Sequence, residues 1–338
     1  MKNYSFLIIV FLMVFGCKSN VNRKEQPKTD KLIVYTTHNI IWEKNWKDVF
    51  SDFEKKNECV LEFITFSNSN HLLEALKKDP VADIVLGLDN INYYTDYLDT
   101  LFIPYKPAGA KAIKEDLIFD KKFILTPVSY GELSFIINQS EIGDPPYTFG
   151  IMQDGMFKQK LLFPDPRTSS YGKAFLIWSI SNFGVNGYGH FWRSIKENIF
   201  TTTDNWDESY NMFLAGEAPI VLGYSTIPLY HIIRDSSHLV ESVIPIEGGF
   251  RIIETAGIYY KSQNLLLSQK FIDYLLKPEY QNTILTTKWV YPATIIESTR
   301  SGDKFPEMTK DLTFELSAKY TRQNFNNWLD RWISLMEK

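Results

Sequence analysis

Short apolar runs alternate with helical patterns in the first part of the chain. Residues 32–35 form a β-branched run typical of a buried strand, and apolar side chains in 46–53 recur at the i, i+3, i+4 and i+7 spacing of one helix face. A second strand over 60–66, a second helix around 72–76 and a third strand over 83–86 follow. Strands that alternate with helices predict βαβ units and a parallel sheet.

The same order recurs after residue 160. Strand patterns over 161–163 and 220–222 are each followed by a helical pattern, over 173–181 and 229–234. This repetition predicts a second α/β domain.

Two longer β-rich stretches separate and follow these regions. Residues 126–138 are broken by Gly131, and residues 242–260 are broken by Gly248-Gly249. We interpret both as crossings between the domains, after which helices near 269–276 and 324–335 return to the first domain. The predicted organisation is two α/β lobes joined by hinge crossovers around a ligand cleft. Lobe 1 comprises residues 31–130 and 250–338, and lobe 2 comprises residues 131–249.

The N-terminal segment has the pattern of an export signal. An apolar run over 6–15 is too short to span a bilayer as a helix, which predicts a signal peptide over 1–16. The run ends at Val14-Phe15-Gly16-Cys17, which resembles a lipoprotein signal, so Cys17 is the predicted lipidation site. The polar segment 17–30 would then be a flexible tether. In the alternative, an ordinary signal peptide is cleaved and Cys17 is incidental; both interpretations place the protein outside the cytoplasm.

Composition and charge exclude several classes of protein. The 338 residues are 44% hydrophobic and 22% charged, which is typical of a folded globular chain. Basic residues number 36 against 40 acidic ones, and they occur as scattered pairs, so a nucleic-acid partner is not expected. The second cysteine, Cys59, begins an apolar stretch and is expected to be a buried structural thiol.

Three turns lie where ligands of open α/β sheets bind, beyond the carboxyl ends of strands. They are Gly87–Asn90, Asp165–Gly172 and Gly223–Thr226. Two lobes that face each other across these turns would form a cleft. Gly87, in the first of these turns, is part of the predicted site.

The turns carry polar groups suited to a ligand. Thr168, Ser169 and Ser170 precede a helix and offer hydroxyls and free N–H groups to an anion or a hydroxyl, although a plain N-cap has the same pattern. Asp89 could be the counter-ion of a cationic ligand or an ordinary turn residue.

Aromatic residues make up 15% of the chain, and several lie at helix edges or in turns. These are Trp206, Tyr210, Tyr224, Tyr230, Trp289 and Tyr291. Each alone is compatible with core packing. Together with Asp89 and the hydroxyl-rich helix start, they fit a flat, positively charged ligand that carries a hydroxyl or a phosphate.

Five stretches in this order and spacing resemble the thiamine-binding periplasmic proteins of bacterial ABC importers. They are residues 82–90, 165–170, 206–210, 224–231 and 289–292, and the resemblance extends over about residues 31–335. It implies a type II periplasmic-binding-protein-like fold and a ligand that is thiamine, thiamine monophosphate or thiamine diphosphate.

The resemblance also implies roles for individual residues. Tyr230 and Trp289 would be walls against the thiamine rings, and Ser169 with its neighbouring backbone would hold the hydroxyethyl or phosphate end. Further contacts would come from Trp206, Tyr224 and Asp89, and the predicted site is completed by Thr168, Ser170, Gly87 and Tyr291.

The chain departs from this family at two positions. Thr37, followed by His38, stands where close relatives carry a second aromatic residue, a role that Trp42 could take over. Lys288 stands where a small or amide residue is expected.

The resemblance further implies a binding protein that carries out no chemistry and uses no cofactor or metal. Its expected partners are thiamine and an ABC permease in the inner membrane, with membrane attachment through the lipid on Cys17. The expected state is a periplasmic monomer.

The sequence has partial patterns of two other functions. An enzyme is disfavoured because Gly223–Ile227 begins like a nucleophile elbow but lacks its final glycine, and the five histidines show no zinc-site spacing. A ferric-ion-binding protein of a related importer would use tyrosine oxygens, and the adjacent pairs Tyr93-Tyr94 and Tyr259-Tyr260 are its candidates.

Overall fold

The computed structural model describes residues 30–37, 46–78, 80–295 and 316–337. Cys17, the signal peptide and nearly all of the tether lie outside these ranges, as do His38 and Trp42. Among the helices of the described ranges, none has the length and apolar character needed to cross a membrane.

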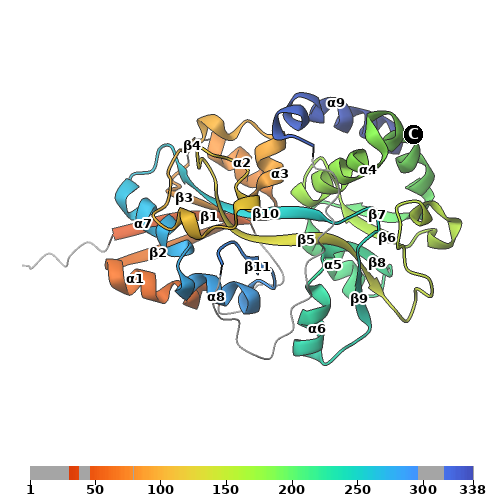
Figure 1. Ribbon diagram of the computed structural model, residues 1–338, viewed down its shortest axis with the longest axis horizontal. Coiled ribbons are helices and arrows are strands. Elements are labelled where there is room, and N and C mark those ends of the chain that lie inside the picture. Colours follow the sequence, from red (N-terminus) through yellow and green to blue (C-terminus); the bar gives the residue numbers. More distant parts are fainter. Residues whose placement is uncertain (1–29, 38–45, 79, 296–315, 338) are drawn as a thin grey trace, which may run out of the picture.

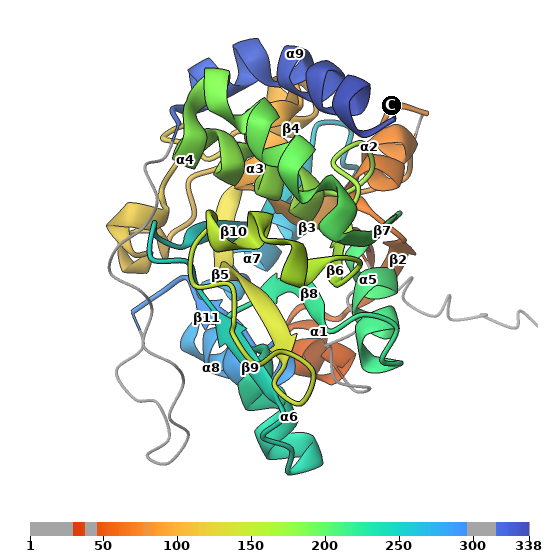
Figure 2. The same cartoon turned by 90° about the vertical axis from the view of Figure 1, so that its right-hand side faces the viewer.

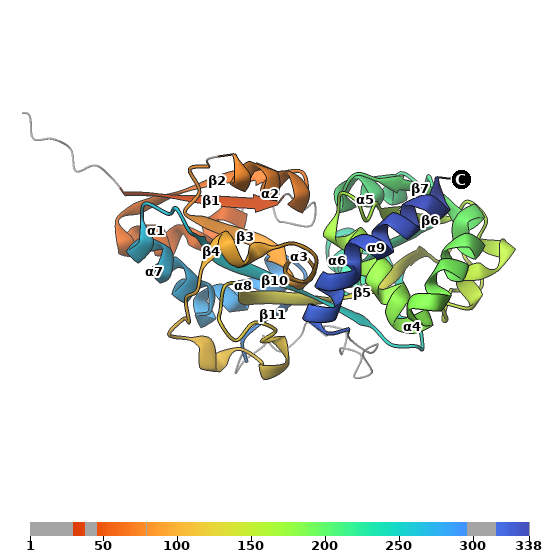
Figure 3. The same cartoon turned by 90° about the horizontal axis from the view of Figure 1, so that it is seen from above.

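The chain forms two α/β lobes that share one continuous sheet (Figures 1 and 3). The first lobe contains β1 (Asp30–Thr37), β2 (Cys59–Phe66), β3 (Ile84–Asp89), β4 (Phe102–Ile103), α1 (Ser51–Asn57), α2 (Ser69–Lys77), α3 (Asn90–Thr95), α7 (Leu265–Leu275) and α8 (Pro278–Thr287). The second contains β6 (Leu161–Pro164), β7 (Ile199–Thr203), β8 (Ile220–Tyr224), α4 (Ser170–Ile195), α5 (Trp206–Leu214) and α6 (Ile227–Asp235).

Parallel pairing within each lobe follows the predicted βαβ order. β1 lies between β2 and β3 and is parallel to both, with Leu32 opposite Leu61. In the second lobe β6 is parallel to β7 and β8. The side chains of β3, β6 and β8 are almost all buried, since helices cover both faces of a parallel sheet.

Two long strands, β5 (Thr126–Asn138) and β10 (Phe250–Tyr259), run antiparallel to one another between the lobes. They form the centre of the strand order β2-β1-β3-β10-β5-β8-β6-β7. Figure 1 shows both crossing from one lobe to the other. The stretch predicted over 242–260 is divided between β9 (Val240–Val243) and β10, and both pair with β5.

The last helix, α9 (Ala318–Met336), packs against α3 of the first lobe and α4 of the second (Figure 2). Trp332 contacts Trp192 of α4 edge to face, and Arg322 bonds Asp99 beside α3. The prediction that this helix returns to lobe 1 therefore describes only half of its contacts.

Candidate functional site

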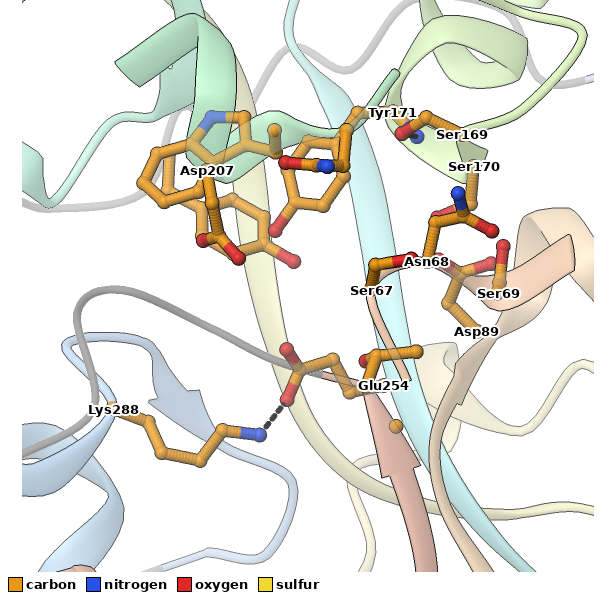
Figure 4. Close-up of a pocket in the computed structure, with 15 residues that line it drawn as sticks. Ser67, Asn68, Ser69, Asp89, Ser169, Ser170, Tyr171, Asp207, Glu254 and Lys288 are labelled. Carbon is orange, nitrogen blue, oxygen red and sulfur yellow. Dashed lines mark hydrogen bonds and ion pairs between the residues drawn. The ribbon is translucent and has the colours of Figure 1, made fainter. Parts of the chain in front are cut away.

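A cavity lies between the lobes, where the predicted turns meet. It has about 630 Å³ of empty space, part of which is open to solvent. The described residues that line it are Thr37, Ser67, Asn68, Ser69, Gly87, Asp89, Ser169, Ser170, Tyr171, Asn205, Trp206, Asp207, Tyr224, Glu254 and Lys288. They come from both lobes and from the crossing strand β10 (Figure 4).

Asp89 is the buried carboxylate of the first-lobe side. It is the N-cap of α3, where Oδ1 accepts a hydrogen bond of 2.9 Å from the Asn92 backbone, and it also accepts one from the Ser170 hydroxyl of the second lobe. Burial raises the pKa of Asp89 to about 6, although these bonds and the nearby Lys173 ammonium act in the opposite direction. The residue is therefore near the midpoint of its titration in mildly acidic solution.

Two helix starts from opposite lobes contribute hydroxyls to the cavity. Ser169 is the N-cap of α4 and accepts a hydrogen bond from the Tyr171 backbone, and Ser170 begins the helix. On the first lobe, Asn68 is the N-cap of α2 and Ser69 is its first residue. The positive ends of both helix dipoles thus face polar groups in the cavity.

The second lobe supplies an aromatic wall. Tyr171 and Trp206 stack at 5.9 Å with a 26° angle between their planes, and the rings of Tyr171 and Tyr224 lie 5.5 Å apart. The Trp206 indole donates to the Leu222 carbonyl at 2.8 Å, which fixes its orientation. Desolvation raises the pKa of both tyrosines well above the usual value, so the wall is uncharged at neutral pH.

The remaining wall carries charge. Glu254 of β10 forms an ion pair with Lys288 and accepts a hydrogen bond of 2.6 Å from the Ser129 hydroxyl. Figure 4 shows this pair opposite Tyr171 and Asp207. With Asp89 and Asp207, the described lining residues include three carboxylates and one ammonium, which favours a cationic ligand.

Of the predicted site residues, six line this cavity: Gly87, Asp89, Ser169, Ser170, Trp206 and Tyr224. Gly87 has a φ of 105°, a conformation that glycine adopts without strain, and a Cβ there would lie 3.2 Å from the Thr37 hydroxyl. The turn therefore needs glycine to bring its backbone to the cavity.

The other four predicted residues do not line it. Thr168 directs its hydroxyl to the carbonyls of Asp165 and Asp204, and Tyr291 stacks on Tyr130 in a separate apolar cluster. Tyr230 and Trp289 pack edge to face at 5.5 Å, and Trp289 is only 2% exposed.

Tyr230 and Trp289 are thus brought together beside the cavity without facing it. Trp289 directly follows Lys288, which lines the cavity. The Trp289 carbonyl accepts a hydrogen bond from the Thr226 hydroxyl. Contact between these two rings and a ligand stays a prediction.

Sequence reasoning missed several lining residues. Tyr171 lies in the predicted turn but is not among the predicted site residues, and the sequence marks Lys288 only as a departure from the family. Glu254 carries no local signal because its role depends on pairing with a residue 34 positions away. The polar triplet 67–69 has the ordinary pattern of a helix start, which could have drawn attention to it.

The tyrosine pairs considered for iron lie elsewhere. Tyr259 is buried and donates its hydroxyl to the Leu76 carbonyl, while Tyr93 and Tyr94 pack against Phe119. Neither pair is among the described lining residues, and those residues contain no group of three or more His, Cys, Asp or Glu arranged to hold a metal.

Comparison with known proteins agrees with this architecture. The model of the bacterial extracellular solute-binding protein family matches residues 79–315. The chain belongs to this family. A thiamine-binding periplasmic protein of Brucella melitensis is 29% identical over 341 residues, which cover 99% of both chains.

Solved structures support the same assignment of this solute-binding protein. A periplasmic thiamin binding protein has a TM-score of 0.81 and 25% identity, covering 91% of this chain and 96% of its own. A ferric binding protein from Campylobacter jejuni has a TM-score of 0.73 at 14% identity, over 90% of this chain and 99% of its own, and shares the fold alone. The predicted type II periplasmic-binding-protein fold is confirmed.

Proposed function

We propose that this solute-binding protein captures thiamine or a thiamine phosphate between its lobes and delivers it to an ABC permease. The observation that carries the proposal is the cavity itself, where the residues that the structure describes include an uncharged aromatic wall and three carboxylates. Thiamine joins a flat pyrimidine to a cationic thiazolium ring. Aromatic π faces and carboxylates both attract such a cation electrostatically. The similarity to the thiamine-binding periplasmic protein of Brucella melitensis supports the same ligand.

The energetics require the lobes to close over the ligand. A cation over an aromatic face gains about 0.5–2 kcal/mol, whereas nanomolar affinity corresponds to about 12 kcal/mol. Burial of the whole ligand between two lobes supplies the difference in a hinged binding protein. The protein binds and releases without chemical conversion of the ligand, and we propose that it works as a monomer without cofactor or metal.

The hydroxyethyl or phosphate end of the ligand is assigned to the helix starts. Ser169 and Ser170 at α4, with Asn68 and Ser69 at α2, offer hydroxyl and amide groups at the positive ends of two helix dipoles. The aromatic wall and Glu254 are then left for the rings of the ligand.

Native mass spectrometry of freshly purified protein tests the identity of the ligand. We expect the mass of thiamine or one of its phosphates above that of the apoprotein, and titration calorimetry should show tight thiamine binding. Visible absorbance on addition of ferric ion, with no response to thiamine, would contradict the proposal and favour an iron-binding protein.

Tyr230 and Trp289 remain proposed ligand walls, since Trp289 follows a residue of the cavity. Tyr230→Ala and Trp289→Ala should each weaken thiamine binding at least about tenfold. Trp289→Ala should also lower the melting temperature of the apoprotein, because it removes a buried indole that packs against Tyr230. If both variants keep the wild-type affinity, these rings are not part of the site.

Export and anchoring form a separate proposal. We assign Cys17 as an acylated N-terminal residue that attaches the mature protein to a membrane facing the periplasm. Mass spectrometry of membrane-extracted protein should detect acylated Cys17. A product that is recovered without acylation would contradict the anchor and leave the ligand proposal untouched.

A further inference from the structure

A buried chain of hydrogen bonds lies behind the aromatic wall. The Tyr210 hydroxyl lies 2.6 Å from Nε2 of His231, and Nδ1 of His231 lies 2.8 Å from Oδ2 of Asp235. Tyr210 is 2% exposed and His231 5%, whereas half of the Asp235 side chain is accessible to solvent. The chain thus runs from the surface of α6 into the core of the second lobe.

The chemistry of the three groups assigns the protons. A carboxylate only accepts hydrogen bonds, so Nδ1 of His231 donates to Asp235. In the tautomer that carries its proton on Nδ1, Nε2 of His231 accepts a hydrogen bond from the Tyr210 hydroxyl. Burial raises the pKa of Tyr210, which keeps the phenol protonated and able to donate. Each polar atom of the contact therefore has a matching partner.

This chain ends against a residue of the cavity. The Tyr210 ring stacks on Trp206 at 4.7 Å with an angle of 16°, and both residues lie on the same face of α5, four positions apart. Trp206 and Tyr171, which also stack on one another, line the cavity, whereas Tyr210 does not. The hydrogen bond to His231 joins α6 to the support of the Trp206 indole.

We propose that His231, oriented by Asp235, is a positioning residue of the ligand site. By holding the Tyr210 hydroxyl, it fixes the ring on which the cavity-lining indole of Trp206 rests. A preorganised wall binds more tightly because less side-chain freedom is lost when the ligand is bound. The inference rests on the proposed function for the identity of the ligand, but the arrangement of the rings can be tested without any ligand.

The test removes each hydrogen bond while keeping the ring stack. Tyr210→Phe retains the ring and loses the hydroxyl, and His231→Phe removes the acceptor. We expect both variants to change the tryptophan bands of the near-ultraviolet circular dichroism of the ligand-free protein. Thiamine binding measured by calorimetry should weaken by about threefold to tenfold, as expected for the loss of one buried hydrogen bond.

Three further variants make the test specific. His231→Gln places an amide that can accept from Tyr210, so it should recover most of the affinity. Asp235→Asn, at a half-exposed position, should give a smaller change in the same direction. Glu197→Gln removes an exposed charge from the same lobe, where it pairs with Lys158, and should alter neither measurement.

Coupling between the variants decides the result. The Tyr210→Phe and His231→Phe double variant should be no weaker than either single one, and Tyr210→Phe should leave the tryptophan bands unchanged in a Trp206→Phe background. The positioning role would be overturned if both single variants kept the wild-type spectra and affinity. It would also be overturned if the loss of affinity in the double variant equalled the product of the two single losses. If the wild-type protein does not bind thiamine but the variants change the tryptophan bands, the proposed function is contradicted instead.

Discussion

The Nζ atom of Lys173 lies 3.0 Å from Oδ2 of Asp96, across the boundary between the two lobes. Lys173 belongs to the first turn of α4 and is 5% exposed, and Asp96 ends α3. The same ammonium lies 3.4 Å from Oδ1 of Asn70 and from Oγ1 of Thr95. A second polar contact between the lobes joins the side chains of Asn68 and Asp204 at 3.0 Å. These contacts hold the lobes together along one edge of the cavity.

Removal of the Lys173 ammonium should favour separation of the lobes. In Lys173→Met, the partly exposed Asp96 carboxylate loses its buried partner on the other lobe, which weakens the contact between the lobes. We expect a larger radius of gyration of the ligand-free protein in small-angle X-ray scattering and thiamine binding at least about tenfold weaker. Lys158→Met, which breaks an exposed ion pair within the second lobe, is the matched control. An unchanged radius and affinity would show that this pair does not stabilise closure.

The Trp206 indole should carry a large share of the ligand contact. Trp206→Ala removes the central ring of the aromatic wall and leaves Tyr171 without its stacking partner, so thiamine affinity should fall by about tenfold or more. Trp206→Phe keeps a smaller ring and should lose less. Tyr97→Ala, at an exposed position outside the cavity, is the control. Calorimetry would contradict the assignment if Trp206→Ala bound as tightly as the control.

Much of the fold follows from local patterns in the sequence. The β-branched runs and helix-face spacings before residue 90 predict strands and helices that the structure places in a parallel sheet, and the stretch 126–138 coincides with β5. The position of α9 was not predictable in the same way. Its apolar face shows that it packs against something, but the choice of partner depends on tertiary contacts with α3 and α4.

The site was predictable where chemistry and local structure coincide. Asp89, Ser169 and Trp206 lie at strand ends or helix starts, and the rule that ligands bind at such turns locates them in the cavity. Glu254 and Lys288 become a pair only through the fold, since a strand through the middle of the sheet meets the end of a distant helix. Burial of Trp289 is also a property of packing, which the residue type alone does not reveal.

Asp89 should make the stability of the apoprotein depend on pH. Its folded pKa of about 6 exceeds the unfolded value of 3.8, so the protonated form stabilises the fold below about pH 4 and this contribution is lost as the pH rises to about 6. This difference between the folded and unfolded pKa of Asp89 corresponds to about 3 kcal/mol in the free energy of unfolding. Asparagine also caps helices, so Asp89→Asn keeps the N-cap of α3. The variant should therefore have a higher melting temperature than the wild type at pH 8 and a similar one at pH 4.

The same substitution should impair function, because the ionised Asp89 attracts a cationic ligand. We expect Asp89→Asn to bind thiamine more weakly at pH 8 although its apoprotein is more stable. Asp144→Asn, at an exposed loop position, is the control for removal of one negative charge. A melting temperature difference that does not change between pH 4 and pH 8 would contradict the buried titration.

Lys288 should set the preference between thiamine and its phosphates. It is the one ammonium among the described lining residues and is held by Glu254, so Lys288→Met makes the cavity more negative by one charge. The more negative cavity should repel a diphosphate, so thiamine diphosphate binding should weaken about tenfold relative to thiamine binding. The ratio of the two dissociation constants from calorimetry measures the effect.

Stability separates this charge effect from a loss of structure. In Lys288→Met the buried Glu254 loses its ion-pair partner and keeps the hydrogen bond from the Ser129 hydroxyl, so the melting temperature of the variant should fall. The double variant Lys288→Met/Glu254→Gln removes both charges and should recover most of that stability. It should also return the ratio of the two affinities toward the wild-type value, because the net charge of the cavity is then restored. If Lys288→Met leaves the ratio unchanged while its stability falls, the ammonium stabilises the fold without contributing to the choice of ligand.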